Sequence, residues 1–157
     1  MSLIIATGSN IGDKLQNLEL VKERLKKEFN FIAQSDVFKS EAVDYLDQPD
    51  FYNQVLEFQI PNESPSNVLK NLLNIEKEFG RVRDIDKGPR TIDIDIIFWS
   101  TEHINETGLT VPHPSWSERS FVVRPLQQLP FFQTLEKCFK IPSEFKIEAK
   151  PINNPKG

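Results

Sequence analysis

Two aspartates at alternate positions of an apolar segment are the first residues whose spacing could support chemistry. Asp93 and Asp95 lie in the run Thr91-Ile92-Asp93-Ile94-Asp95-Ile96-Ile97. In a strand, side chains two residues apart share a face, so both carboxylates would point the same way with their Cα atoms about 6.5–7 Å apart. The opposite face would carry the core residues, which are Ile92, Ile94, Ile96 and Phe98.

Paired carboxylates of this kind would repel each other unless a cation lies between them. Because the ligands are hard oxygens with no histidine or thiolate beside them, the pair favours Mg²⁺ over zinc or copper. The alternative is a half-exposed strand that presents its acids to water, since aspartates at this spacing are frequent.

A basic segment comes immediately before these aspartates. Residues 81–90 contain three arginines and one lysine, which are Arg81, Arg83, Arg90 and Lys87. Arginine forks match phosphate oxygens, and Mg²⁺ commonly reaches a protein through one or two carboxylates together with substrate phosphates. The combination predicts a polyphosphate site, although these arginines could instead pair with Asp84 and Asp86 in a solvated loop.

Three further residues are candidates for ligand contacts. His113 lies between two prolines, which restrict its backbone, so its ring could be aimed at a phosphate oxygen; it could equally be a turn histidine bonded to nearby backbone. Phe51 and Asn53 share one strand face and would suit a planar heterocycle, or they could pack for structural reasons alone. His103 we assign to the surface. Residues 8–14 read GxxxGDK, which is not a P-loop.

The elements that must position these residues follow from hydrophobic periodicity and turn signals. We predict strands at 3–7, 31–38, 51–60 and 91–99, and a helix capped by Asp13. Ser64-Pro65 begins a second helix that Gly80 ends. The apolar face of the first helix consists of Leu15, Leu18, Val21, Leu25 and Phe29. Residues 41–50 and 81–90 have loop composition, 100–108 a hairpin or loop, 121–129 helical character, and 142–157 little core signal.

The order strand, helix, strand, strand, helix, strand indicates the split βαβ unit of an α+β fold. Two helices would cover one face of an antiparallel sheet and leave the other face open for ligands. The length of 157 residues fits a single domain, residues 1–157.

Composition narrows the class of protein. The net charge of −4 argues against a nucleic-acid-coating protein, and one cysteine, Cys138, excludes a cysteine-based zinc cage and an internal disulfide. No apolar run approaches the roughly 18 residues of a membrane span, and the first residues lack a cationic leader. We expect a cytoplasmic protein without a nucleic-acid or membrane partner.

Several blocks of this sequence closely resemble the 6-hydroxymethyl-7,8-dihydropterin pyrophosphokinase family of folate biosynthesis. The longest are Gly80-Arg81-Val82-Arg83 and Gly88-Pro89-Arg90-Thr91-Ile92-Asp93-Ile94-Asp95-Ile96. The shorter ones are Gly8-Ser9-Asn10, Asp47-Gln48-Pro49-Asp50-Phe51-Tyr52-Asn53, and Val111-Pro112-His113 with Arg119 and Phe121. The similarity extends from about Ile4 to Leu126.

The resemblance implies a ferredoxin-like α+β fold and transfer of the β,γ-pyrophosphoryl group of ATP to the pterin hydroxymethyl oxygen, with release of AMP. It implies that Asp93 and Asp95 hold two Mg²⁺ ions. It also implies phosphate contacts from Arg81, Arg90, His113 and Arg119, with Arg83 as an auxiliary. The pterin would lie between Phe51 and Phe121 and be read by Asn53 and by backbone of the loop that includes Val43. Glu76 and Thr110 would contact the nucleoside. The expected partners are therefore ATP and a reduced pterin, bound by a monomer.

Two other functions use part of the same pattern. A two-metal nuclease or phosphodiesterase would also need paired aspartates and arginines, but it predicts a basic groove and more carboxylate ligands. A non-catalytic module of the same fold would bind a nucleotide or regulate a partner, and it would give Phe51, Asn53 and Phe121 no particular role.

Overall fold

The computed structural model describes residues 1–40, 50–80 and 91–152. The six predicted strands and helices occur in the predicted order, except that the predicted strand over 31–38 is two strands, and additional elements complete the C-terminal half. The strands are β1 Ser2–Ser9, β2 Phe31–Gln34, β3 Phe38–Ser40, β4 Phe51–Gln59, β5 Asp93–Trp99, β6 Ile104–Glu106, β7 Leu109–Val111 and β8 Lys150–Pro151. The helices are α1 Lys14–Lys26, α2 Pro65–Glu78, the short 3₁₀ turn η1 Trp116–Glu118, α3 Ser120–Leu126 and α4 Phe132–Cys138.

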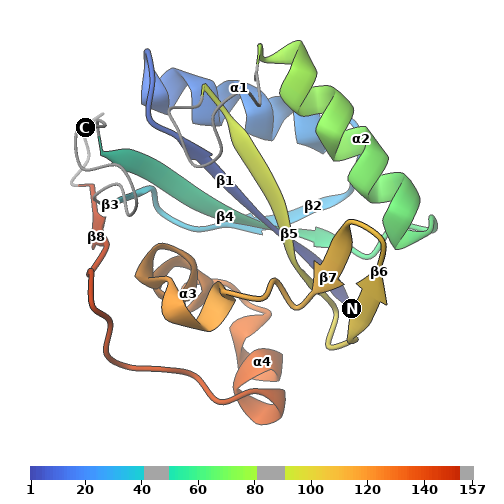
Figure 1. The fold of residues 1–157 in the computed structure, drawn as a ribbon, viewed down its shortest axis with the longest axis vertical. Helices are drawn as coiled ribbons and strands as arrows, with labels where there is room; N and C mark the ends of the chain where they lie inside the picture. Colours follow the sequence, from blue (N-terminus) through green and yellow to red (C-terminus); the bar gives the residue numbers. More distant parts are fainter. Residues whose placement is uncertain (41–49, 81–90, 153–157) are drawn as a thin grey trace.

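The main sheet is antiparallel and has the order β5-β1-β4-β3-β8, with β2 also pairing with β4 (Figure 1). β1 and β4 are the central strands, and β5 is at one edge. A separate hairpin joins β6 and β7. The fold class is therefore α+β, as predicted.

The two long helices begin where their capping residues predict. Asp13 Oδ1 accepts the N–H of Gln16 at 3.1 Å at the start of α1. Ser64 Oγ accepts the N–H of Asn67 at 3.2 Å at the start of α2, where Pro65 occupies the first turn. Gly80 follows α2 with φ +79°, a conformation that glycine adopts without a Cβ penalty. These local signals confirm both predicted helices.

One face of the sheet packs against α1 and α2 and forms the first core. The buried helix residues are Leu18, Val21 and Leu25 of α1 and Val68, Leu72 and Ile75 of α2, and they pack with Leu3, Ile5, Leu56, Phe58, Ile94 and Ile96 of the strands. Leu15, which we expected on this apolar face, is 41% exposed. The core face of α1 therefore begins at Leu18.

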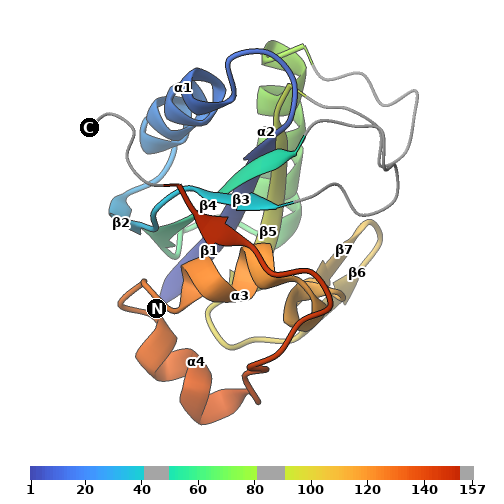
Figure 2. The same ribbon diagram turned by 90° about the vertical axis from the view of Figure 1, so that its left-hand side faces the viewer.

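The opposite face is not open along its whole length, which corrects the predicted open sheet. Ile4, Val55 and Ile97 are covered by α3, α4 and the segments beside them (Figure 2). The buried residues on the covering side are Trp116, Val122, Val123, Leu126, Leu129, Phe131 and Leu135. This second core was not predicted because α3 and α4 are too short to produce a long apolar periodicity.

Strand β5 contains an irregularity that corrects one predicted core residue. Ile5 pairs with Ile96 and Ile4 pairs with Phe98, so Ile97 is an extra residue between them. Beyond this β-bulge the alternation is shifted. Phe98 consequently lies in the second core, with its ring 5.1 Å from that of Trp116, and not with Ile92, Ile94 and Ile96 in the first.

The predicted strand over 31–38 is two strands. Ser35 interrupts it, because its Oγ accepts the backbone N–H of Val55 at 3.0 Å and replaces a regular ladder contact.

The expectation of little core signal beyond residue 142 is also wrong. Ala149 is buried, Phe145 packs on the second core, and β8 pairs with β3.

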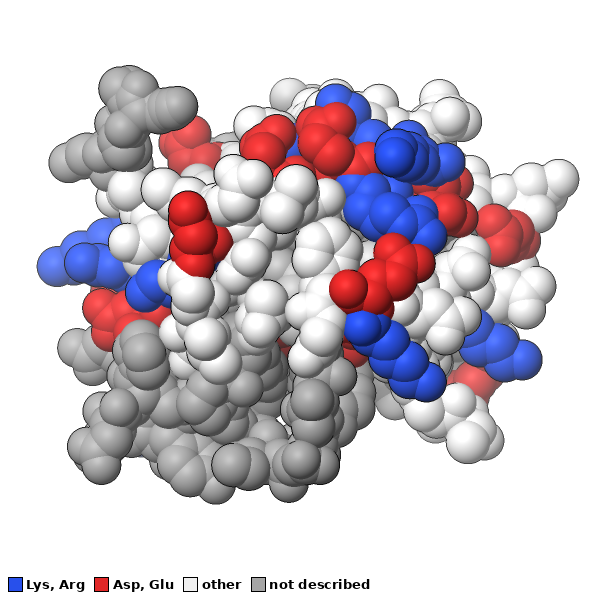
Figure 3. Space-filling model, turned by 90° about the horizontal axis from the view of Figure 1, so that it is seen from above, with Lys and Arg blue, Asp and Glu red and all other residues white. Residues whose placement is uncertain are grey.

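The outer side of α1 and α2 carries interleaved basic and acidic side chains (Figure 3). Arg24 of α1 bonds to Glu78 of α2 through two nitrogens, at 2.9 and 3.1 Å, and to Glu28 at 2.7 Å. Exposed ion pairs therefore join α1 to α2 on this face.

No helix in the described ranges is both long enough and apolar enough to cross a bilayer.

Candidate functional site

The candidate site lies on the second face of the sheet, at the end of the strands away from the second core. In the pairing of β5, β1 and β4, Asp93 is opposite Gly8, and Gly8 is opposite Asn53. Two residues further along, Asp95 is opposite Ala6. Since paired residues share a face, the register confirms that both aspartates point to one side and brings Asn53 to the same side. Both aspartates are partly exposed.

Gly8 allows Asn53 to lie across β1 toward β5. A Cβ atom at position 8 would be 2.7 Å from Asn53 Oδ1, closer than real Cβ contacts. Asn53 Nδ2 donates to Ser40 Oγ of β3 at 3.4 Å, which orients the amide from its other side. Gly8 is therefore required by a close approach of side chain to backbone.

Groups of three or more His, Cys, Asp or Glu side chains that could enclose a metal ion are absent from the described part of the chain. Among the described residues, Asp93 and Asp95 are therefore not part of a closed metal cage made of protein ligands.

His113 is held in place by its own backbone and ring. Its N–H donates to Ile97 O at 3.0 Å, and its Nδ1 accepts the N–H of Ser115 at 3.2 Å. An accepting Nδ1 leaves the proton of the neutral ring on Nε2. Burial lowers the pKa of His113, the positive charge of Arg119 lowers it further, and the carboxylate of Asp93 opposes both effects. Burial and Arg119 thus favour the neutral form of the ring, in which Nε2–H is a hydrogen-bond donor.

Arg119 and Phe121 flank the start of α3. The Arg119 guanidinium lies 5.5 Å from the centroid of the Phe121 ring, and Phe121 is partly buried against the second core. The helix α3, which carries Phe121, packs on β4, the strand that carries Phe51 and Asn53. Phe51 is also partly exposed. The structure thus brings His113, Arg119 and Asp93 together and places Phe51 and Phe121 on adjacent elements.

Glu76 and Thr110 border the outer edge of β5. The N–H of Ile94 donates to Glu76 Oε2 at 2.7 Å, so this buried carboxylate satisfies a backbone donor at an edge strand. Thr110 is exposed on β7, which packs against β5. Four predicted site residues, Val43, Arg81, Arg83 and Arg90, lie outside the described residues.

Two residues of the first turn of α1 were missed by the sequence reasoning. Asn17 Nδ2 donates to Ser9 Oγ at 3.1 Å, to Ile11 O at 3.0 Å and to Thr91 O at 3.4 Å. Lys14 Nζ donates to Asp50 O at 3.2 Å and lies 4.4 Å from the centroid of the Tyr52 ring. The Asn17–Thr91 and Lys14–Asp50 contacts have no sequence signal, because each joins segments distant in the chain. Together they fasten the ends of β4 and β5 nearest the site.

A model of the 7,8-dihydro-6-hydroxymethylpterin-pyrophosphokinase family matches residues 4–130. The folic acid synthesis protein fol1 of Pneumocystis carinii is 40% identical over 126 residues, which are 80% of this chain and 17% of that protein. The 2-amino-4-hydroxy-6-hydroxymethyldihydropteridine pyrophosphokinases of Bacillus subtilis and Haemophilus influenzae are 36% and 35% identical over 127 residues. These matches cover 80% of this chain, 75% of the Bacillus protein and 79% of the Haemophilus protein.

The chain thus spans less than a fifth of the fungal relative and most of the bacterial ones. The matched residues include every described element of the candidate site, from Gly8 to Phe121. The resemblance found in the sequence is confirmed, and the chain belongs to the 7,8-dihydro-6-hydroxymethylpterin-pyrophosphokinase family.

Proposed function

We propose that this chain transfers the β,γ-pyrophosphoryl group of ATP to the hydroxymethyl oxygen of 6-hydroxymethyl-7,8-dihydropterin and releases AMP, a step of folate biosynthesis. The observation that carries the proposal is the row Asp93, Gly8, Asn53 across three adjacent strands. This row brings the Asp93 carboxylate, which suits a metal ion that also binds phosphate, to the same face as the Asn53 amide, which suits the polar edge of a heterocycle. Family membership supports the same reaction.

Asp93 and Asp95 would hold two Mg²⁺ ions. Two oxygen-donor side chains on one face, without a third ligand among the described residues, suit an ion that also binds substrate oxygens. When bound, the ions would neutralise charge on the phosphate chain and align it for in-line attack.

The protein's own contribution would be positioning and electrostatics. His113 would donate its Nε2–H, and Arg119 its guanidinium N–H groups, to phosphate oxygens, because the two residues lie together beside Asp93. Arg81, Arg83 and Arg90 would add positive charge, as the family resemblance implies. Preorganised donors of this kind stabilise charge that develops during transfer, so we assign no general base.

The pterin would stack between Phe51 and Phe121, with Asn53 bonding its polar edge and backbone near Val43 completing the contacts. The support is that Phe51 and Asn53 share a face of β4 and that α3, which carries Phe121, packs on this strand. Stacking of a planar ring on each phenyl face would contribute about 0.5–1.5 kcal/mol beyond the burial of apolar area. Its hydroxymethyl group would then lie toward the aspartates.

Glu76 and Thr110 would contact the nucleoside. Both border the outer edge of β5, Glu76 through the N–H of Ile94 and Thr110 through β7.

The helices α1 and α2 on one face of a sheet of order β5-β1-β4-β3 also support a ferredoxin-like arrangement. We further propose a monomer without nucleic-acid or membrane partners. The exposed, unpaired thiol of Cys138 supports a cytoplasmic location.

The direct test is release of AMP from ATP and Mg²⁺ with and without 6-hydroxymethyl-7,8-dihydropterin. Pterin-dependent AMP is the expected result. Cleavage of an oligonucleotide would instead favour the two-metal nuclease, and the absence of both activities would favour a binding module. Asp93→Asn is the matched negative control, because it removes one charge of the pair without changing the size of the side chain.

A further inference from the structure

Residues 141–152, which we call the C-terminal strap, lie beyond the family match at residues 4–130. The strap leaves α4, passes α3 and ends at the edge of the main sheet as β8 (Figures 1 and 2). It therefore connects two elements that carry candidate pterin contacts, α3 and the β3–β4 pair.

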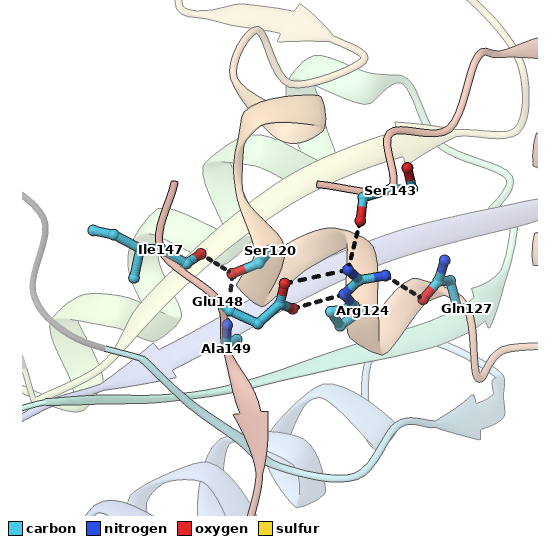
Figure 4. A network of polar contacts seen from close by, with 7 residues as sticks. All are labelled: Ser120, Arg124, Gln127, Ser143, Ile147, Glu148 and Ala149. Carbon is cyan, nitrogen blue, oxygen red and sulfur yellow. Dashed lines mark hydrogen bonds and ion pairs between the residues drawn. The ribbon is translucent and has the colours of Figure 1, made fainter. Parts of the chain in front are cut away.

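The first connection is at Ser120, between Arg119 and Phe121. Ser120 Oγ donates to Ile147 O at 2.6 Å and accepts the N–H of Ala149 at 2.7 Å, and Ser120 is 2% exposed (Figure 4). One buried hydroxyl thus bonds two backbone groups of the strap. The first residue of α3 is held where the helix presents Phe121.

The second connection is one turn further along α3. Arg124 Nε and Nη2 bond the two oxygens of Glu148 at 2.7 and 3.2 Å, and Nη2 also donates to Ser143 O at 2.9 Å (Figure 4). The guanidinium lies 5.0 Å from the centroid of the Phe145 ring. A bidentate pair fixes both distance and orientation, so the strap follows α3 over a full helical turn.

The third connection is to the sheet. Lys150 pairs with Lys39 and Pro151 with Phe38, and the N–H of Ile152 donates to Val37 O at 2.9 Å. β3 is the strand whose Ser40 accepts from the Asn53 amide. The strap therefore spans from the helix that carries Phe121 to the strand that orients Asn53.

We propose that the C-terminal strap sets the spacing between Phe121 and the Phe51–Asn53 face of β4, and that Ser120, Arg124 and Glu148 are positioning residues for the bound pterin. This inference rests on the proposed function. None of the three touches the pterin; each acts through the placement of α3. A stacked ring needs its two aromatic neighbours at a fixed separation, so loosening α3 weakens pterin binding more than ATP binding.

The experiment compares Glu148→Gln with Glu78→Gln in the full chain. Both remove one partner of an exposed bidentate arginine pair, but Glu78 joins α1 to α2 on the opposite side of the sheet. The readouts are KM for pterin, KM for ATP, and pterin affinity by calorimetry with a non-hydrolysable ATP analogue. Amide hydrogen exchange at Phe121 and Val122 reports the placement of α3 directly.

We expect Glu148→Gln and Ser120→Ala to raise KM and Kd for pterin about three- to tenfold, with KM for ATP changed less than about twofold and faster exchange at Phe121. Glu148→Asp, which keeps the charge, should give an intermediate value. Glu78→Gln should leave both KM values and the exchange unchanged.

Equal pterin parameters for Glu148→Gln and Glu78→Gln would overturn the inference while leaving the proposed function intact. A wild-type chain that neither binds pterin nor releases AMP in its presence would overturn the proposed function itself, and with it the ligand assigned to the strap. The two failures are distinguished by the wild-type measurement.

Discussion

The proposed function makes turnover depend on the negative charge of Asp93 and Asp95 in β5. Asp95→Asn should lower kcat by about 10³-fold or more, because the neutral amide binds Mg²⁺ far less well than a carboxylate does. The free energy of unfolding should change by less than about 1 kcal/mol, since two carboxylates on one face repel each other and the variant removes one charge. Steady-state kinetics and urea unfolding give both values. A variant that loses activity only because it unfolds would make the pair structural.

We predict that Gly8 supports pterin binding because it leaves space for the side chain of Asn53. Gly8→Ala places a Cβ 2.7 Å from the present position of Asn53 Oδ1, so the amide must move. We expect pterin affinity to fall about tenfold, the equivalent of one lost hydrogen bond. Calorimetry of Gly8→Ala, Asn53→Ala and the double variant tests the coupling. Fully additive losses in the double variant would contradict it, because both changes are expected to remove the same contact.

His113 predicts a dependence of stability on pH. Its pKa is lowered in the folded chain, chiefly by burial and then by Arg119, so the unfolded chain binds more protons at pH values just below the ordinary value of 6.5. The free energy of unfolding should therefore fall as the pH decreases from about 7 through this range. His113→Gln should lose less stability than wild type between pH 7.5 and pH 5.

Urea unfolding at several pH values measures this difference. The control is His103→Gln, which removes the exposed histidine of the chain and keeps the partly buried one, His113. Parallel pH profiles of wild type and His113→Gln would show that His113 does not contribute.

The first turn of α1 is the element that fastens both ends of the site. Asn17→Ala removes three hydrogen bonds that join Ser9, Ile11 and Thr91. We expect a loss of about 1–2 kcal/mol in unfolding free energy and a clear fall in kcat/KM, because Thr91 leads directly into the strand of Asp93. Asn30→Ala is the control. Among the described contacts, the side-chain amide of Asn30 donates one hydrogen bond, to the exposed side chain of Gln59. A destabilised Asn17→Ala variant with unchanged kcat/KM would show that the anchor is structural alone.

Local sequence signals identified the elements that they control directly. The Asp13 and Ser64 caps, the glycine after α2 and the alternation around Asp93 and Asp95 each depend on residues within a few positions, and the structure confirms them. The bulge at Ile97 and the break at Ser35 depend on the partner strand, which the sequence of one strand does not reveal. They account for the misplacement of Phe98 and for the overlong strand over 31–38.

The candidate site was predictable to the extent that its residues belong to recognisable blocks. The charges of Arg119 and Asp93, which are 6 and 20 residues from His113 in the sequence, both act on its ring, and the roles of these three residues in a site stay predictions. Asn17, Lys14 and the strap residues act through contacts between distant segments, such as Asn17 with Thr91 and Ser120 with Ile147. No periodicity or spacing in one sequence encodes such pairs.

The molecule is a sheet between two cores, and this arrangement separates the core residues from the residues of the candidate site. The first core joins α1 and α2 to one face, and the second joins α3 and α4 to the other while the aspartates and Asn53 lie beyond its end. That residues 1–157 form a single domain stays a prediction. The fungal relative carries the family's sequence as 17% of a longer protein, so the matched unit occurs within larger proteins as well.

A crystal structure of the chain with Mg²⁺, a non-hydrolysable ATP analogue and 6-hydroxymethyl-7,8-dihydropterin tests the central claim most directly. We predict metal ions bound to Asp93 and Asp95 and to phosphate oxygens, with the pterin ring between Phe51 and Phe121 and its polar edge on Asn53. Aspartates without a coordinated ion, or a pterin bound away from these two phenylalanines, would contradict the account.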